Sequence, residues 1–337
     1  MRRHRSIMLA ALAVLAMLGL AGPVAAQKAG RHGTVRTDTL WSQALGVRKQ
    51  VVVWLPPSYT QEASLRYPVA YYLHGLWGDE TNWLQLGKID ATLDSLMRAG
   101  LPEMIVVMPD GDDGWWTTWN TLGDFAACRR TGAADRKEPA DSYCVPWPHY
   151  DDYVARDLVQ HVDRSYRTRA DRAHRGIAGL SMGGYGALSI AFAYPDIFTA
   201  AASHSGVLSP LLGGRDTTSR TTRYASNGAQ LREGWGPRFW GLIAPAFGTD
   251  TAAWWSRDPG RRATRLAATR RALLPRLFID VGTDDGLLEQ SRDLRATLQR
   301  AGIAHDYAEH PGAHDWDYWR KHVAASAAWM SRVIGAP

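Results

Sequence analysis

The chain has 337 residues, 45% of them hydrophobic and 21% charged, and this balance excludes an intrinsically disordered protein. Its length allows one large α/β domain or two small ones. The formal net charge of +6 falls to about +3 without the first 26 residues, which hold Arg2, Arg3 and Arg5, and that bias is too weak to indicate nucleic-acid binding.

The first 26 residues have the layout of a secretory signal peptide. The basic start is followed by an apolar run from Ile7 to Leu20, then by Gly22-Pro23 and a small-residue exit at Val24 to Ala26. The apolar run is too short to span a bilayer comfortably. We therefore expect cleavage near Ala26 and export to the periplasm or outside the cell. No later segment is apolar enough to cross a membrane, so the mature chain is expected to be soluble.

Beyond the signal peptide, short apolar runs alternate with helical patterns and no internal repeat is found, which predicts a single α/β domain over 27–337. Strands are expected over 51–55, 69–73, 104–108, 176–180, 198–203 and 277–281, with a further one just before the last helix. Helices are expected over 89–99, 153–166, 183–194, 287–301 and 319–334. This alternation is typical of a mostly parallel central sheet with helices on both faces.

Two long stretches interrupt the alternation, and long excursions of this kind are usually functional loops or lids. Residues 112–150 carry Trp115, Trp116 and Trp119, which are predicted to bind substrate. Residues 207–262 form a predicted lid, which carries further tryptophans at 235, 240, 254 and 255. Flat aromatic walls suit a planar acyl group or a sugar ring. The alternative is that these side chains only pack the lid against the core.

The two cysteines, Cys128 and Cys144, flank a polar stretch rich in arginine, alanine and aspartate. An exported protein meets an oxidising environment, so a disulfide between them is predicted. Two cysteines without a nearby histidine cluster do not make a zinc site, and neither a metal nor a cofactor is expected.

The segment Gly179-Leu180-Ser181-Met182-Gly183 has the G-x-S-x-G pattern. A predicted strand precedes it and a predicted helix follows, which is the setting in which a sharp turn projects the serine hydroxyl above the sheet edge. Ser181 is therefore the predicted nucleophile. The helix that follows places partial positive charge beside a developing oxyanion.

A serine nucleophile needs a histidine base and a carboxylate to hold it, in the chain order serine, acid, histidine in this fold. His314 is the predicted base because it lies in a turn before the last helix, whereas His305 and His310 fall in or at the end of the preceding strand. Asp284 and Asp285 follow a predicted strand, and either could be the acid or the N-cap of the next helix. The backbone N–H groups of Leu76 and Met182 are the expected oxyanion donors, with Leu76 in the turn His74-Gly75-Leu76-Trp77-Gly78.

Five segments in this order resemble the putative-esterase (esterase D-like) family of α/β-hydrolases: Leu73-His74-Gly75, Gly179 to Leu188, Ser205-Gly206, Gly282-Thr283-Asp284-Asp285 and Gly312 to Trp316. The family includes feruloyl and acetylxylan esterases, S-formylglutathione hydrolases and mycolyltransferases. The resemblance implies that Asp285 is the acid. It also implies that Pro109 to Trp116 lines the acyl site, with Trp116 at the place of the family's tyrosine.

The leading interpretation is an exported serine carboxylic-ester hydrolase acting through an acyl-enzyme on short-chain or aromatic esters of small molecules or saccharides. An acyltransferase resembling the mycolyltransferases is the alternative, although their acid is usually glutamate. S-formylglutathione hydrolysis takes place in the cytosol, so this activity fits an export signal poorly. A non-enzymatic carbohydrate-binding protein would use some of the 15 tryptophans to stack sugars, but the intact serine, aspartate and histidine argue against it.

Overall fold

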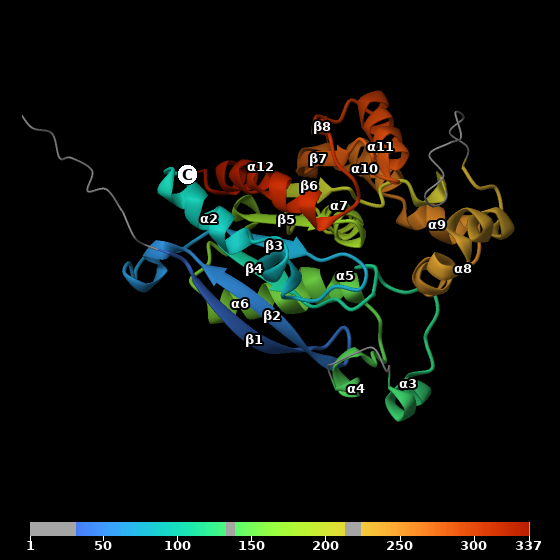
Figure 1. Cartoon of the computed structure of the whole chain (residues 1–337), viewed down its shortest axis with the longest axis horizontal. Helices are drawn as coiled ribbons and strands as arrows, with labels where there is room; N and C mark the ends of the chain where they lie inside the picture. The colour runs from blue at the N-terminus through green and yellow to red at the C-terminus, as the bar shows by residue number, and fades with distance from the viewer. Residues whose placement is uncertain (1–31, 133–138, 213–223, 337) are drawn as a thin grey trace, which may run out of the picture. The chain divides into compact units, whose positions relative to one another are not determined.

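The computed structural model describes residues 32–132, 139–212 and 224–336, so the predicted signal peptide lies outside the described residues. The described residues form an eight-stranded sheet in the order β1-β2-β4-β3-β5-β6-β7-β8 (Figure 1). The pairs β1–β2 and β2–β4 are antiparallel, and all other pairs are parallel, as predicted for a mostly parallel sheet. The strands are β1 Thr34–Ser42, β2 Val47–Leu55, β3 Val69–Leu73, β4 Ile105–Pro109, β5 Arg175–Leu180, β6 Ala200–His204, β7 Arg276–Gly282 and β8 Asp306–His310.

Strand β1 was not predicted from the sequence. Most of its side chains are exposed, so it lacks the apolar run that identifies the buried strands. It pairs with β2 along its whole length, from Thr34 opposite Leu55 to Ser42 opposite Val47. This pairing also explains why β2 begins at Val47, four residues before the predicted start at Val51.

Helices cover both faces of the sheet, and side chains that alternate along each strand divide the core into two layers. On one face, α2 Ile89–Arg98 packs beside α12 Trp316–Ile334. The other face is covered by α6 Val159–Ser165, α7 Met182–Ala193, α10 Pro259–Thr269 and α11 Leu288–Arg300. The neighbours Tyr71 and Tyr72 belong to the two different layers. No helix in the described ranges is long and apolar enough to cross a membrane.

The last helix and the helix predicted over 153–166 differ from the predictions. The last helix begins at Trp316 rather than Trp319, because the Asp315 carboxylate accepts from the Tyr318 N–H at 2.9 Å and caps the first turn. The helix predicted over 153–166 consists of successive pieces: α5 Tyr150–Asp152, the π-helical η2 Tyr153–Leu158, and α6. Outside 112–150 and 207–262, the remaining short helices of the described residues are η1 Pro57–Thr60, α1 Asn82–Gln85, η3 Arg172–His174 and η5 Arg271–Leu273. A further short helix, η4 Pro210–Leu212, lies near the start of 207–262.

The segment predicted as a lid over 207–262 contains helices that the sequence patterns did not reveal. These are α8 Gly228–Phe247, α9 Thr251–Arg257 and the start of α10. The helical period of α8 is interrupted at Gly236, whose φ is +69°, and at the following Pro237. Trp254 is fully buried, and the Trp240 ring stacks on it with centroids 6.1 Å apart. Trp254 belongs to the hydrophobic core and Trp240 packs against it, as in the alternative interpretation that these side chains pack the lid against the core.

The structure contains the predicted disulfide. Cys128 lies in α3 Phe125–Thr131 and Cys144 directly follows α4 Ala140–Tyr143, and their Cα atoms are 5.7 Å apart. We expect non-reduced peptide maps of the protein to show the two cysteine peptides linked, lighter by two hydrogens than the free pair. Replacing both cysteines with serine should lower the free energy of unfolding by about 3 kcal/mol, the loop-closure contribution of a bridge of this span. Free thiols at both positions would contradict this prediction.

Candidate active site

Ser181 lies in the sharp turn between β5 and α7, with φ +52° and ψ −118°, a conformation that non-glycine residues rarely adopt. Backbone hydrogen bonds hold the turn: the Ser181 N–H donates to the His204 carbonyl at 3.0 Å, and the Val207 N–H donates to the Ser181 carbonyl at 3.3 Å. A Cβ atom on Gly183 would lie 2.4 Å from the Leu73 carbonyl oxygen. The helix can therefore approach β3 this closely only with glycine at that position.

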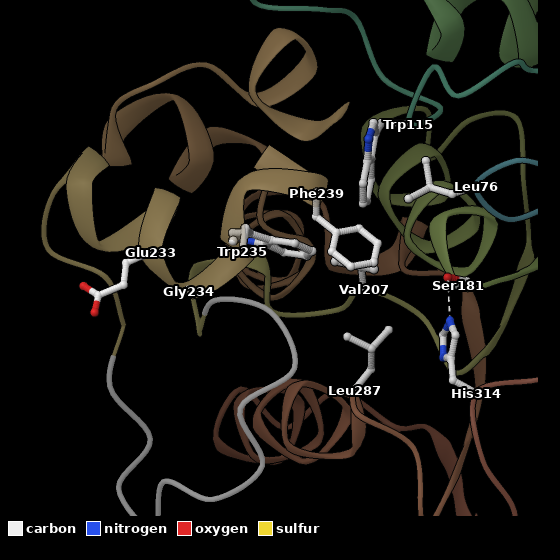
Figure 2. A pocket seen from close by; sticks show the side chains of 11 residues that line it. Leu76, Trp115, Ser181, Val207, Glu233, Gly234, Trp235, Phe239, Leu287 and His314 are labelled. Carbon is white, nitrogen blue, oxygen red and sulfur yellow. Dashed lines mark hydrogen bonds between the residues drawn. The ribbon is translucent and has the colours of Figure 1, made fainter. Parts of the chain in front are cut away.

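His314 comes from the loop between β8 and α12, and its Nε2 lies 2.8 Å from the Ser181 Oγ (Figure 2). Its Nδ1 lies 3.0 Å and 2.8 Å from the two carboxylate oxygens of Asp285. The three residues predicted from the sequence thus form one continuous hydrogen-bonded chain. The His314 ring also packs edge-on against Trp319, with centroids 5.0 Å apart, which restricts its orientation.

Asp285 is buried, whereas Asp284 is exposed. Burial by itself would raise the pKa of the Asp285 carboxyl, but the hydrogen bond and charge of His314 and the bond from the Leu287 N–H hold that pKa below its usual value. The N-cap position of α11 is occupied by Leu287, so neither carboxylate caps that helix as the N-cap residue. The geometry therefore distinguishes the two aspartates that the residue pattern alone left open.

The acid and histidine loops are joined through their backbones. The Asp284 N–H donates to the Gly312 carbonyl at 2.9 Å, and the Thr283 N–H donates to the His310 carbonyl at 2.8 Å. A Cβ atom on Gly282 would lie 2.2 Å from the Gly312 carbonyl oxygen, so only glycine allows this approach. This close contact fixes the loop that carries Asp285 relative to the loop that carries His314.

The other polar candidates near the sheet edge have structural partners. His305 Nδ1 lies 2.8 Å from the Ile303 carbonyl, and the His310 ring stacks on His322 with centroids 4.4 Å apart. Asp280 lies inside β7, as expected, where its carboxylate contacts His204 Nδ1 at 2.9 Å. It also accepts from the Tyr318 hydroxyl at 3.2 Å.

The two residues predicted to donate to the oxyanion lie next to Ser181, one in space and one in the chain. A Cβ atom on Gly75 would lie 3.3 Å from the Ser181 Cβ, which places the turn carrying Leu76 directly beside the serine. Met182 opens α7, and the first N–H groups of a helix have no acceptor within it. Both residues are therefore close enough to Ser181 for their N–H groups to be candidate donors to an oxyanion formed there.

An apolar cavity of about 340 Å³ opens at Ser181 and His314. Its walls include Leu76, Trp115, Val207, Trp235, Phe239 and Leu287. The Trp115 and Trp235 rings meet edge to face at 6.1 Å. Their indole N–H groups donate to the Leu242 and Pro210 carbonyls, so both rings present carbon atoms to the cavity. Figure 2 shows the Glu233 carboxylate pointing away from these aromatic rings, which leaves the walls apolar.

A second cavity of about 240 Å³ also reaches Ser181. It shares Leu76, Phe239 and His314 with the first cavity, and its remaining walls include Trp77, Asn82, Trp316 and Trp319. Ser181 is therefore accessible from two hollows, with Phe239 of α8 lining both.

The three tryptophans predicted to bind substrate occupy different places. Trp115 lines the first cavity. Trp116 is fully buried and donates from its indole N–H to the His74 carbonyl at 3.1 Å, so it supports the turn beside Ser181 and does not line that cavity. Trp119 lines a separate hollow of about 150 Å³ near Cys128. Trp116 and Trp119 are therefore not among the residues that line the cavity at Ser181, because nearby residues of an irregular loop need not face the same way.

The loop 109–116 takes part in a buried ion cluster that was not predicted from the sequence. Lys49 Nζ lies 2.9 Å from an Asp110 carboxylate oxygen and 2.5 Å from one of Asp112, and Tyr150 donates to Asp112 at 2.8 Å. Burial alone would lower the pKa of the Lys49 ammonium, but the two carboxylates raise it. A single lysine in a strand carries no sequence signal of such a role, and the same holds for the cavity residues Val207, Phe239 and Leu287.

Comparison with known proteins places this geometry in a family. The model of the family described as Putative esterase matches residues 42–330. An acetyl esterase of Caldicellulosiruptor saccharolyticus is 27% identical over 78% of this chain and 83% of its own length. An endo-1,4-beta-xylanase/feruloyl esterase of Xylanibacter ruminicola is 30% identical over 50% of this chain, but only 21% of its own length is matched.

Among solved structures, a ferulic acid esterase superposes with a TM-score of 0.67 at 26% identity, covering 90% of this chain and 99% of that one. The family match and the superposition both extend over most of the chain. The chain therefore belongs to the Putative esterase family and is a carboxylic-ester hydrolase with the α/β-hydrolase fold.

Proposed function

We propose that the protein hydrolyses carboxylic esters through a covalent acyl-enzyme on Ser181. The observation that carries this proposal is the hydrogen-bonded chain from Ser181 Oγ through His314 to Asp285. His314 Nε2 takes the hydroxyl proton as Oγ attacks the ester carbonyl, and then gives it to the departing alcohol. In the second half-reaction His314 activates a water molecule, which releases the acid and restores the serine. Asp285 holds the Nδ1 proton and stabilises the imidazolium.

We assign the backbone N–H groups of Leu76 and Met182 the role of stabilising the negative charge that develops on the ester carbonyl oxygen. The position of the Leu76 turn beside Ser181 and the place of Met182 at the start of α7 support this assignment. The N-terminus of α7 adds partial positive charge at the same point. Preorganised donors of this kind are commonly the largest single contribution to acyl-transfer catalysis.

The first cavity is assigned to the acyl group. Its rigid indole walls at Trp115 and Trp235 favour short or planar aromatic acyl groups over long flexible chains. Relatives named as acetyl esterase and ferulic acid esterase support the same classes. We expect kcat/KM for acetyl, butyryl or feruloyl p-nitrophenyl-type esters to exceed that for palmitoyl esters, and a preference for palmitoyl would contradict the assignment.

A pair of variants sharpens that measurement. Trp235→Ala removes a cavity wall and should raise the ratio of kcat/KM for palmitoyl over acetyl esters. Trp240→Ala is the matched control, because that ring stacks on Trp254 outside the walls of the cavity. If the ratio of kcat/KM for palmitoyl over acetyl esters were the same in the two variants, the cavity wall at Trp235 would not determine the chain-length preference.

The second cavity is assigned to the alcohol, which His314 must reach in order to protonate it. The exposed ring of Trp77, together with Trp316, offers flat aromatic surfaces of the kind on which sugar rings stack. We therefore propose saccharide esters as the natural substrates. Hydrolysis of an acetylated or feruloylated oligosaccharide that is no better than that of the corresponding methyl ester would argue against this.

We further propose that the protein acts outside the cytoplasm. The layout of residues 1–26 and the Cys128–Cys144 disulfide support export. Cell fractionation with sequencing of the mature N-terminus tests this, and a cytoplasmic protein that retains Met1 would overturn it.

Asp285→Asn should lower kcat by about ten-thousand-fold, because an amide cannot hold the histidine in the required tautomer. Asp284→Asn is the matched control, since the side chain of Asp284 is exposed and lies next to Asp285 in the chain. Its kcat for p-nitrophenyl acetate should stay at the parent level. Similar losses in both variants would show that the acid has been assigned incorrectly.

A further inference from the structure

The His74 ring lies between the turn beside Ser181 and the loop 109–116, and it is bonded to both. Its Nε2 lies 3.0 Å from the Gly111 backbone nitrogen, which can only donate. Its Nδ1 lies 2.8 Å from the Gly75 carbonyl oxygen, which can only accept. These two contacts require a neutral ring with the proton on Nδ1. The side chain is 1% exposed, and burial, opposed by the charge of Asp110, lowers its pKa, in agreement with a neutral ring.

The Gly75 carbonyl and the Leu76 N–H belong to the same peptide group, which is planar, so that fixing the direction of one fixes the other. We propose that His74 is a positioning residue that sets the Gly75–Leu76 peptide and thereby aims the Leu76 N–H at the oxyanion. A hydrogen bond accepted by the carbonyl also polarises the peptide and makes its N–H a stronger donor. This inference rests on the proposed role of Leu76 as an oxyanion donor.

Further hydrogen bonds hold the turn that carries Gly75 and Leu76. The Trp77 N–H donates to the Asp113 carboxylate at 2.6 Å, and the Trp116 indole donates to the His74 carbonyl at 3.1 Å. The Gly78 N–H donates to the Gly75 carbonyl at 3.2 Å, as a second donor to that oxygen. The loop 109–116 is itself anchored from below by the Lys49 ion pairs with Asp110 and Asp112. Among these contacts, the His74 side chain joins the Gly111 N–H of the anchored loop to the carbonyl of the Gly75–Leu76 peptide beside the nucleophile.

Three substitutions separate this role from simple packing. His74→Asn keeps a side-chain N–H near the position of Nδ1, His74→Gln moves the amide out to the position of Nε2, and His74→Phe fills the space without any donor. We expect the Gln and Phe variants to lose about a hundredfold in kcat for p-nitrophenyl acetate with little change in KM, the size of losing one oxyanion donor. The Asn variant should retain kcat within about tenfold of the parent, since its donor can still reach the Gly75 carbonyl.

A transition-state analogue provides the second readout. The affinity for a trifluoromethyl ketone, which forms an oxyanion on Ser181, should fall in parallel with kcat/KM across the three variants. His305→Phe is the matched control, because it removes the same type of bond, from Nδ1 to the Ile303 carbonyl at 2.8 Å, outside the site. It should retain the parent kcat. Asn and Phe variants with equal losses, or a rise in KM without loss of kcat, would overturn the proposal.

The unaltered enzyme gives a test that does not depend on the folding of a variant. Nitrogen-15 NMR of the histidine side chains should show His74 as the neutral tautomer with the proton on Nδ1, and a proton on Nε2 would overturn the proposal. If Ser181→Ala is inactive while His74→Phe has the parent kcat, this inference fails and the proposed function stands. If Ser181→Ala is active, the proposed function itself fails.

Discussion

Ser181→Ala is expected to lower kcat for p-nitrophenyl acetate by about a million-fold, the loss that follows removal of a triad serine. The substitution removes the atom that forms the acyl-enzyme, so the covalent route is lost completely. Residual turnover would come from the Leu76 and Met182 N–H groups and from binding in the cavity. Because these remain, KM should change far less than kcat.

The Ser181→Ala protein should fold normally. Its backbone conformation at φ +52° is already occupied by a residue with a Cβ atom, so alanine adds no new strain. The melting temperature should therefore match that of the parent, and a fluorophosphonate probe should label the parent and not the variant. Activity within tenfold of the parent, in a preparation shown to be free of other esterases, would reject Ser181 as the nucleophile.

His314→Ala is expected to cost about as much as the loss of the serine, since removing either member of a serine–histidine pair disables both. Without the imidazole, Ser181 Oγ loses its acceptor at 2.8 Å and stays protonated, and the departing alcohol has no proton donor. The measurement is kcat for p-nitrophenyl acetate, with a phenyl ester of poorer leaving group as a second substrate. The loss should be larger for the poorer leaving group, because that alcohol depends more on protonation by His314.

Two neighbouring histidines are the controls for this prediction. His305→Ala and His310→Ala remove rings that contact the Ile303 carbonyl and His322, respectively, and both should keep kcat near the parent value. The Thr283–His310 bond uses only the backbone of His310, so the alanine variant preserves the join between the acid and histidine loops. An inactive His310→Ala with an active His314→Ala would reverse the assignment of the base.

Several features of this protein could be predicted from the sequence because they depend on local patterns. Buried parallel strands such as β3 read as apolar runs, and its bounds, Val69–Leu73, match the prediction. The turn at Ser181 was predictable because its glycines and the adjoining strand and helix lie within a few residues of it. His314 could be selected among its neighbours because it alone follows a strand in a turn. The family resemblance, rather than the residue pattern, selected Asp285 over Asp284.

Other features were decided only by the tertiary structure. Edge strand β1 is stabilised by its pairing with β2, so its own side chains carry little apolar signal. Trp115 and Trp116 are adjacent in an irregular loop, and only the packing of that loop turns one into the cavity and the other under His74. The link from Lys49 through the loop 109–116 to His74 joins segments far apart in the chain. Such contacts leave no periodicity in the sequence, because hydrogen bonds between distant loops depend on where the sheet brings those loops together.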